Sequence, residues 1–173
     1  MKRFLILALS ALMAFVACDE ANKDQTPEGG EQSVEGRWNV LRFAEDPDFY
    51  GFVLIFKESS LDLYIIPYGH HLQGSYTYSN GVVSYNITAG YQAFTDVTFD
   101  GEGNMTSYLW ESGNLDQNTL TLAEGFDWYP MSEETLEMYK EECASISFSF
   151  NAAGGVTLSG VLGLEDLTAF RQK

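Results

Sequence analysis

Cysteine and histidine are both scarce in this chain, which has two of each among its 173 residues. A disulfide framework needs several cysteine pairs, and a zinc site needs several cysteine or histidine ligands. With so few of these residues, the sequence favours neither a disulfide framework nor a zinc site. His70 and His71 are adjacent, and on a strand their side chains would point to opposite faces. Pro67 and Gly69 precede them and favour a solvated turn. We therefore expect no metal site and no cofactor.

Catalytic motifs are also missing: the sequence has no Gly-x-Ser-x-Gly, no P-loop and no zinc motif. Cys143 follows Leu136 and Tyr139 at helical spacing, which indicates a small buried residue rather than a reactive thiolate. Asp100 begins a loop like that of a calcium site, but Met105 stands where the loop needs glycine, so a plain hairpin turn is favoured. With 25 acidic residues, paired carboxylates arise by chance. We expect no enzymatic activity.

Basic residues are few, at nine Lys and Arg against 25 Asp and Glu, for a net charge of −16. Such a surface repels nucleic acid and anionic lipid head groups, so we exclude both as partners. The charge keeps the protein soluble, and it would also attract cations or a basic partner.

The apolar run from Phe4 to Val16 is broken only by Ser10 and falls short of the ~20 residues that a membrane-spanning helix needs. Lys2 and Arg3 precede it, and a small residue, Ala17, ends it. This order is typical of a secretory signal peptide, here residues 1–17. Its removal takes away two basic residues and no acidic one, which moves the net charge to −18.

Residues 15–18 (FVAC) resemble the lipobox of bacterial lipoproteins. The resemblance implies cleavage before Cys18 and acyl chains, palmitate among them, on its sulfur and amine, which would anchor the protein to a membrane. The alternative is an ordinary secreted protein. Asp19 and Glu20 resemble the acidic residues that follow the lipid in lipoproteins of Bacteroidetes, which implies the cell envelope, the outer membrane and its cell-surface face.

Residues 18–33 are polar and lack aromatic side chains, so they cannot bury enough apolar surface to fold. We interpret them as a lipidated cysteine and a flexible tether. Residues 34–173 are sufficient for one domain with its own core.

Apolar and polar residues alternate along this domain, with frequent turn residues between the segments, which indicates an all-β meander. Asn80-Gly81 is the strongest hairpin signal. One helix is expected near residues 132–143, where Ser132 can cap it and two glutamates follow. The expected strands cover residues 38–43, 52–56, 61–66, 75–79, 82–88, 91–99, 105–110, 119–122, 146–150, 156–161 and 167–170.

Two motifs resemble lipocalins. Gly36-Arg37-Trp38 resembles their Gly-x-Trp opening, whose Trp plugs the closed end of the barrel, and residues 74–85 resemble the central hairpin of lipocalin-like lipoproteins of the Bacteroidetes type. The resemblance covers residues 34–125 and implies an antiparallel meander that closes into a lipocalin-like barrel. The sequence departs from lipocalins where their Thr-Asp-Tyr motif is missing and where three strands, not one, follow the helix. Another barrel or a β-sandwich remains the alternative.

Four aromatic residues are candidates for ligand contact: Trp110, Phe126, Trp128 and Tyr129. The last three cluster in a loop before the helix, where aromatic side chains either face a ligand or pack the helix onto the barrel.

Three functions are compatible with these features. The first is a lipid-anchored extracytoplasmic binding module that holds a small apolar or amphipathic ligand inside the barrel. The second is a cell-envelope interaction or inhibitor protein whose barrel is solid. The third is a glycan-binding lipoprotein, which needs coplanar exposed aromatic rings.

Overall fold

The computed structural model describes residues 33–41, 50–111, 113–151 and 155–172. From Ser33 onward the chain forms one compact unit. The expectations for the signal peptide, for Cys18 and for most of the tether concern residues 1–32, which lie outside the described residues.

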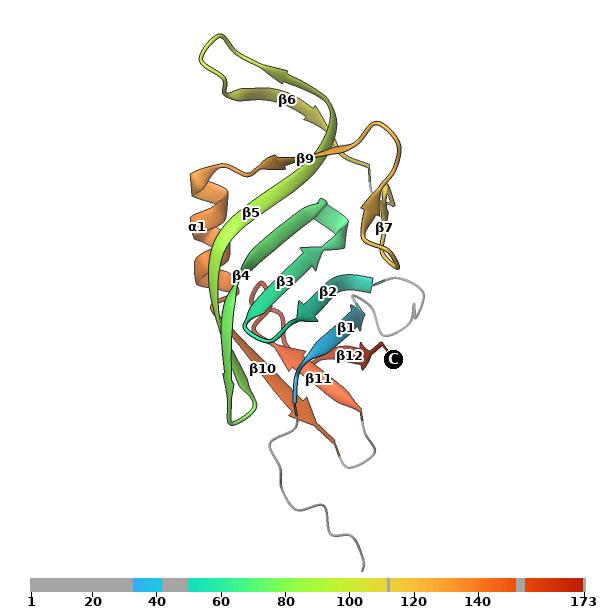
Figure 1. Ribbon diagram of the computed structural model, residues 1–173, viewed down its shortest axis with the longest axis vertical. Coiled ribbons are helices and arrows are strands. Elements are labelled where there is room, and N and C mark those ends of the chain that lie inside the picture. Colours follow the sequence, from blue (N-terminus) through green and yellow to red (C-terminus); the bar gives the residue numbers. More distant parts are fainter. Residues whose placement is uncertain (1–32, 42–49, 112, 152–154, 173) are drawn as a thin grey trace, which may run out of the picture. The chain divides into compact units, whose positions relative to one another are not determined.

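Eight antiparallel strands close into a barrel, which confirms the expected fold class and excludes an open sandwich (Figure 1). Each strand pairs with the next along the chain, and the barrel closes where the last strand pairs with the first. The eight strands are β1 (Gly36–Leu41), β2 (Tyr50–Phe56), β3 (Ser60–Ile65), β4 (His70–Ser79), β5 (Val82–Phe99), β10 (Ser145–Phe150), β11 (Val156–Ser159) and β12 (Leu167–Arg171).

The hairpin between β4 and β5 follows directly from its sequence. Asn80 and Gly81 have φ angles of 53° and 80°, the positive values that a type I′ turn requires. The strand register shifts between Gln73 and Gly74, and a Cβ at Gly74 would lie 2.1 Å from the carbonyl oxygen of Asn86. Only glycine allows this approach, so Gly74 sets the bend of β4 against β5.

The expectation of separate strands at residues 82–88 and 91–99 is wrong, because β5 is one strand of 18 residues. Its first half closes the barrel by pairing with β10. Its second half extends beyond the barrel and pairs with β6 (Met105–Leu109) and β9 (Asp127–Pro130) (Figure 1). The extension is possible because β-formers continue through residues 91–99 without proline.

Two further short elements connect these strands. A 3₁₀ turn, η1 (Ile66–Tyr68), joins β3 to β4. The strands β7 (Leu115–Asp116) and β8 (Thr121–Leu122) form a separate two-stranded hairpin, so the strand expected at residues 119–122 is shorter than predicted.

The expected helix is confirmed as α1 (Glu133–Glu142). Ser132 caps it, since the Ser132 hydroxyl oxygen accepts a hydrogen bond from the backbone N–H of Thr135 at 3.2 Å. Tyr139 and Cys143 are 2% and 0% exposed and belong to the barrel core, as the helical spacing indicated for Cys143. Within the described residues, no helix has both the length and the apolar character needed to cross a membrane.

The core of the domain consists mainly of buried side chains of the barrel strands and of α1. Trp38 is 3% exposed and contacts Phe148 edge-to-face, with 5.6 Å between the ring centroids. Leu54, from the neighbouring strand β2, is fully buried. The other buried residues of this core are Val34, Val40, Phe52, Phe56, Leu61, Leu63, Ile65, Leu72, Val83, Tyr85, Ile87, Met131, Tyr139, Cys143, Ile146, Val156, Leu158, Val161 and Ala169.

Candidate binding groove on the outer face of the barrel

A second apolar cluster lies outside the barrel, on the outward faces of β2 and β3. Residues alternate between the two faces of a strand, so Val53 and Tyr64 point outward where their neighbours point into the core. Leu115 and Leu122 of the β7–β8 hairpin pack against this cluster. Its other members are Ile55, Ile66, Trp110, Leu120 and Trp128.

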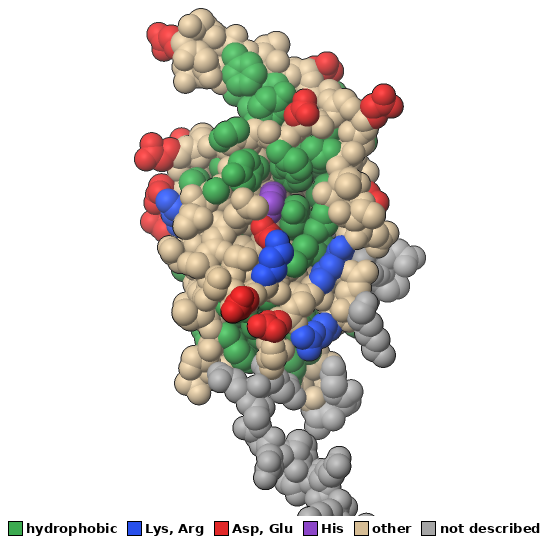
Figure 2. Space-filling model, in the orientation of Figure 1, with side chains coloured by type: hydrophobic (Ala, Val, Ile, Leu, Met, Phe, Trp, Pro, Cys, Tyr) green, Lys and Arg blue, Asp and Glu red, His purple; other side chains and the backbone are tan. Residues whose placement is uncertain are grey.

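This face is hollowed, and hydrophobic side chains border the depression (Figure 2). A histidine is visible in the depression, with an acidic and a basic side chain next to it. Hydrogen bonds join His71 of β4 to Asp62 of β3, and Asp62 to Lys57, on the outward face of these strands. We call the depression the outer groove, and we define it by His71, Asp62, Tyr64, Tyr91 and Trp128.

The floor of the outer groove is a buried histidine–aspartate pair. Asp62 and His71 are 7% and 9% exposed, and Asp62 Oδ1 lies 3.0 Å from His71 Nε2. The same oxygen accepts a hydrogen bond from Gln73, and Oδ2 accepts one from Lys57 at 2.9 Å. Polar groups at this depth need such partners, because an unpaired one costs free energy.

These hydrogen bonds hold Asp62 in its charged form. The bond with His71 contributes most to lowering the pKa of Asp62 far below its ordinary value, although burial acts in the opposite direction. A carboxylate only accepts hydrogen bonds, so His71 Nε2 carries the hydrogen atom and donates a hydrogen bond to Asp62. His71 Nδ1 is the other ring nitrogen and takes no part in this bond.

Aromatic rings form the walls around His71. Tyr64 is stacked on the imidazole with 4.0 Å between the centroids, and Tyr91 lies at 5.9 Å. Trp128 approaches His71 edge-on at 5.7 Å and Tyr64 at 6.2 Å. Burial, followed by the charge of Asp62, raises the pKa of Tyr64 to about 12, so its hydroxyl keeps its proton at neutral pH.

The structure brings three of the four candidate aromatic residues together and separates the fourth. Trp128 lines the outer groove, and Trp110 belongs to the same cluster. Phe126 packs edge-on against Trp110 at 5.9 Å. Tyr129 follows Trp128 on β9 and points to the opposite face, where it contacts Phe99 at 6.0 Å.

Trp110 lies flat against the backbone of Gly69, where an added Cβ would be 2.8 Å from the indole ring. The indole N–H donates to the carbonyl of Pro67 at 3.0 Å. Gly69 also has a φ of 63°, so glycine is needed there both for the turn and for the close contact with the indole ring of Trp110.

The interpretation of His70 and His71 as parts of a solvated turn is wrong, because they begin strand β4. As expected for a strand, they point to opposite faces. The Nδ1 atom of His70 lies 2.6 Å from the hydroxyl of Tyr139, and burial lowers the pKa of His70 to about 4. Among the described residues, no group of three or more His, Cys, Asp or Glu side chains could hold a metal ion.

Asp62 is the functional residue that the sequence reasoning missed. It pairs with Gln73 across β3 and β4, diagonal to His71. The alternating pattern of β3, in which Leu61 and Leu63 point inward, places Asp62 outward, and this was the available signal. Nothing local in the sequence indicates that it contacts a histidine nine residues away.

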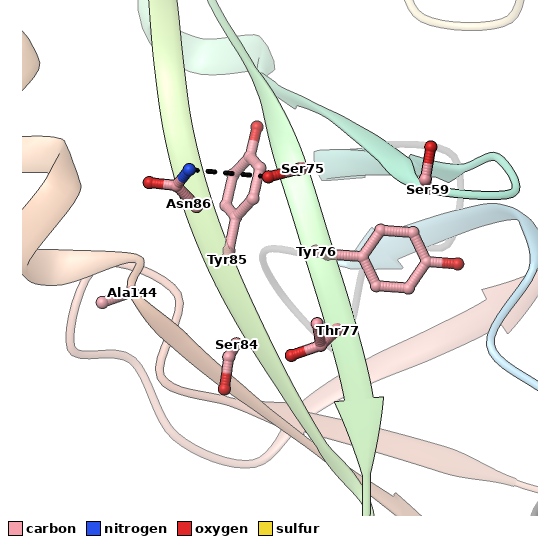
Figure 3. A pocket seen from close by; sticks show the side chains of 8 residues that line it. All are labelled: Ser59, Ser75, Tyr76, Thr77, Ser84, Tyr85, Asn86 and Ala144. Atoms are coloured by element: carbon pink, nitrogen blue, oxygen red, sulfur yellow. Dashed lines mark hydrogen bonds between the residues drawn. The ribbon is translucent and has the colours of Figure 1, made fainter.

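A second hollow, of about 410 Å³, lies on the β4–β5 hairpin (Figure 3). Its lining offers hydroxyl and amide groups and no carboxylate, amine or imidazole, so it can form only neutral hydrogen bonds. The lining residues are Ser59, Ser75, Tyr76, Thr77, Ser84, Tyr85, Asn86 and Ala144.

Comparison of the chain with protein-family models, with curated proteins and with solved structures gives no match. The resemblance to lipocalin-like lipoproteins therefore depends on the motifs, and the functional argument depends on the geometry above.

Proposed function

We propose that this protein is an exported, lipid-anchored interaction protein of the cell envelope that binds a partner through the outer surface of a solid barrel. The observation that supports the proposal is the set of large side chains buried inside the barrel. A barrel of eight strands is just wide enough for its own side chains to fill it, and fully buried residues such as Leu54, Leu63 and Leu72 occupy the space that a small apolar ligand would need.

The outer groove supports surface binding in a different way. It combines aromatic rings, a buried charged pair and the exposed amine of Lys57, whose side chain is 64% exposed. Interfaces between proteins concentrate such residues, with aromatic anchors at the centre and charges at the rim. The rings of Tyr64 and Trp128 stand at 65° to each other, and those of Trp110 and Phe126 at 89°. These angles suit the side chains of a protein partner better than the flat face of a sugar.

Export and lipid attachment remain proposals that depend on the N-terminal motifs. Among the described residues, Cys143 is the cysteine, and it is completely buried in the core, so it is a poor site for acylation. Labelling of cells with an alkyne analogue of palmitate tests this directly. The wild-type protein should carry the label, and Cys18→Ser should lose it. Equal labelling of both would contradict the anchor.

Photo-crosslinking in the native host tests the partner. A photoreactive phenylalanine analogue in place of Trp128 should give a discrete adduct of higher mass. The same analogue in place of Met138, which is 42% exposed on α1, is the matched control and should give none. No adduct from the outer groove, or equal adducts from both positions, would contradict the proposal.

A further inference from the structure

The extension of β5 beyond the barrel creates a strand with an open edge. Among the described residues, β6 pairs with β5 alone and ends the path of the sheet. The other edge of an outer strand presents backbone N–H and C=O groups that a further strand can pair with. In Figure 1, β6 lies at the far end of this extension, away from the barrel strands.

The open edge of β6 is unguarded, in contrast to that of β9. Natural proteins protect open edges with charged residues or proline, and β9 carries both, Asp127 and Pro130, in four residues. The sequence of β6, MTSYL, carries neither. The strands β2, β10 and β11 also lack charged residues, but each has a paired strand on both sides, whereas β6 is uncharged at an edge.

Apolar side chains surround the same edge. Tyr108 and Leu109 of β6 are 62% and 44% exposed, and Phe99 of β5 is 50% exposed. Tyr108 covers Phe94 with 4.1 Å between the ring centroids, so its ring is held in place although it faces solvent. A partner strand would bury these groups, and that burial is favourable.

Charges at the two ends of β6 specify the partner. Glu102 precedes the strand, Glu111 follows it, and both are exposed. Asp100 also precedes it, but its carboxylate is engaged by the backbone N–H groups of Glu102 and Asn104 in the turn. Antiparallel pairing of two copies of β6 would set Glu102 of each copy near Glu111 of the other, between two processed chains of net charge −18. Like charges so placed disfavour a second copy.

We infer that the open edge of β6 binds an extended segment of another protein, apolar in its middle and basic at both ends. This inference depends on the proposal that the outer surface of the domain does the binding. It adds a second site, separate from the outer groove. The two sites can be tested independently, by crosslinking at Trp128 and by strand addition at β6.

The test uses the chain from Asp19 onward and a fluorescent peptide of alternating valine and threonine with two lysines at each end. Anisotropy at low salt should show binding. Hydrogen exchange measured by mass spectrometry should show new protection of the amides in residues 105–109. Glu102→Lys combined with Glu111→Lys should weaken binding by roughly tenfold. Glu165→Lys, an exposed charge reversal outside this extension, is the matched control and should leave binding unchanged.

Three outcomes would overturn the inference. The first is the absence of binding, or protection that appears outside β6. The second is equal affinity for the same peptide with glutamates in place of its lysines. The third is a dimer in sedimentation velocity that is lost in Ser107→Lys, because the edge would then bind a second copy. None of these results would affect a crosslink from Trp128, so failure of this inference is distinguishable from failure of the proposed function.

Discussion

Asp62 and His71 form a hydrogen bond of 3.0 Å on the outer wall of the barrel, and both side chains are almost completely buried there. Ionisable side chains usually lie exposed at the surface, whereas this pair is covered by aromatic rings and by the groups around the outer groove. The pair places the charge of Asp62 on the wall and determines which nitrogen of His71 carries the proton.

Asp62→Asn should destabilise the fold by about 1–3 kcal/mol, because it removes a charged acceptor from three donors at once. Lys57→Ala removes only the exposed partner and should cost less than about 1 kcal/mol. Urea denaturation followed by tryptophan fluorescence measures both. Equal decreases in unfolding free energy for the two substitutions would show that the buried Asp62–His71 pair contributes no more to stability than the exposed Lys57 does.

Stability should fall as pH falls from about 6.5 to 4, because of His70. In the unfolded chain His70 takes up a proton below pH ~6.5, whereas in the fold burial keeps it neutral until about pH 4. The unfolded state therefore binds more protons in this window, and up to about 3 kcal/mol is lost across it. The contribution of Asp62, whose pKa is lowered, is present above about pH 4 and is lost only below that.

His70→Asn isolates this effect, since its amide oxygen can still accept from the Tyr139 hydroxyl but has no proton to gain. The slope of unfolding free energy against pH between 4 and 6.5 should become flatter than in the wild type. An unchanged slope would assign the pH dependence to other groups.

The thiol of Cys143 should be unreactive in the folded protein. Burial raises its pKa to about 11, and the side chain is completely buried, so almost no thiolate exists at pH 8 and no reagent reaches it. A thiol-specific reagent should label it only after denaturant is added. Rapid labelling of the native chain from Asp19 onward would contradict this burial.

Leu54→Ala should destabilise the protein by about 2–5 kcal/mol, since Leu54 is fully buried in the centre of a packed interior. Phe170→Ala, at a residue 52% exposed on β12, should change stability by no more than about 0.5 kcal/mol. Thermal or urea unfolding distinguishes the two. A small decrease in stability for Leu54→Ala would mean that the interior of the barrel is loosely packed.

Local signals in the sequence predicted much of the fold. The apolar run of β2, the alternation of β3 and β10, the Asn80-Gly81 turn and the cap at Ser132 each act over a few residues, so each was visible in the chain. The closure of β5 onto β10 joins residues about sixty apart, and the sequence indicated a closed barrel only through the resemblance to lipocalins.

The candidate site was less accessible to sequence reasoning. Trp128 was identified by type and position, but its partners Asp62 and His71 come from other strands and meet it only through the register of β3, β4 and β5. Tyr129 was included with Trp128 because they are neighbours, although neighbours on a strand point apart. The alternation of a strand indicates which of its side chains point inward. It does not predict whether these side chains fill the barrel, because that depends on how the strands are staggered around it.

Native mass spectrometry of the chain from Asp19 onward, exported and purified in its own host without detergent, tests the solid barrel most directly. We expect the mass of the polypeptide alone, because the interior is occupied by residues such as Leu54 and Trp38. A reproducible additional mass of a few hundred daltons, released only when the protein unfolds, would show a small ligand inside the barrel and would contradict the central claim.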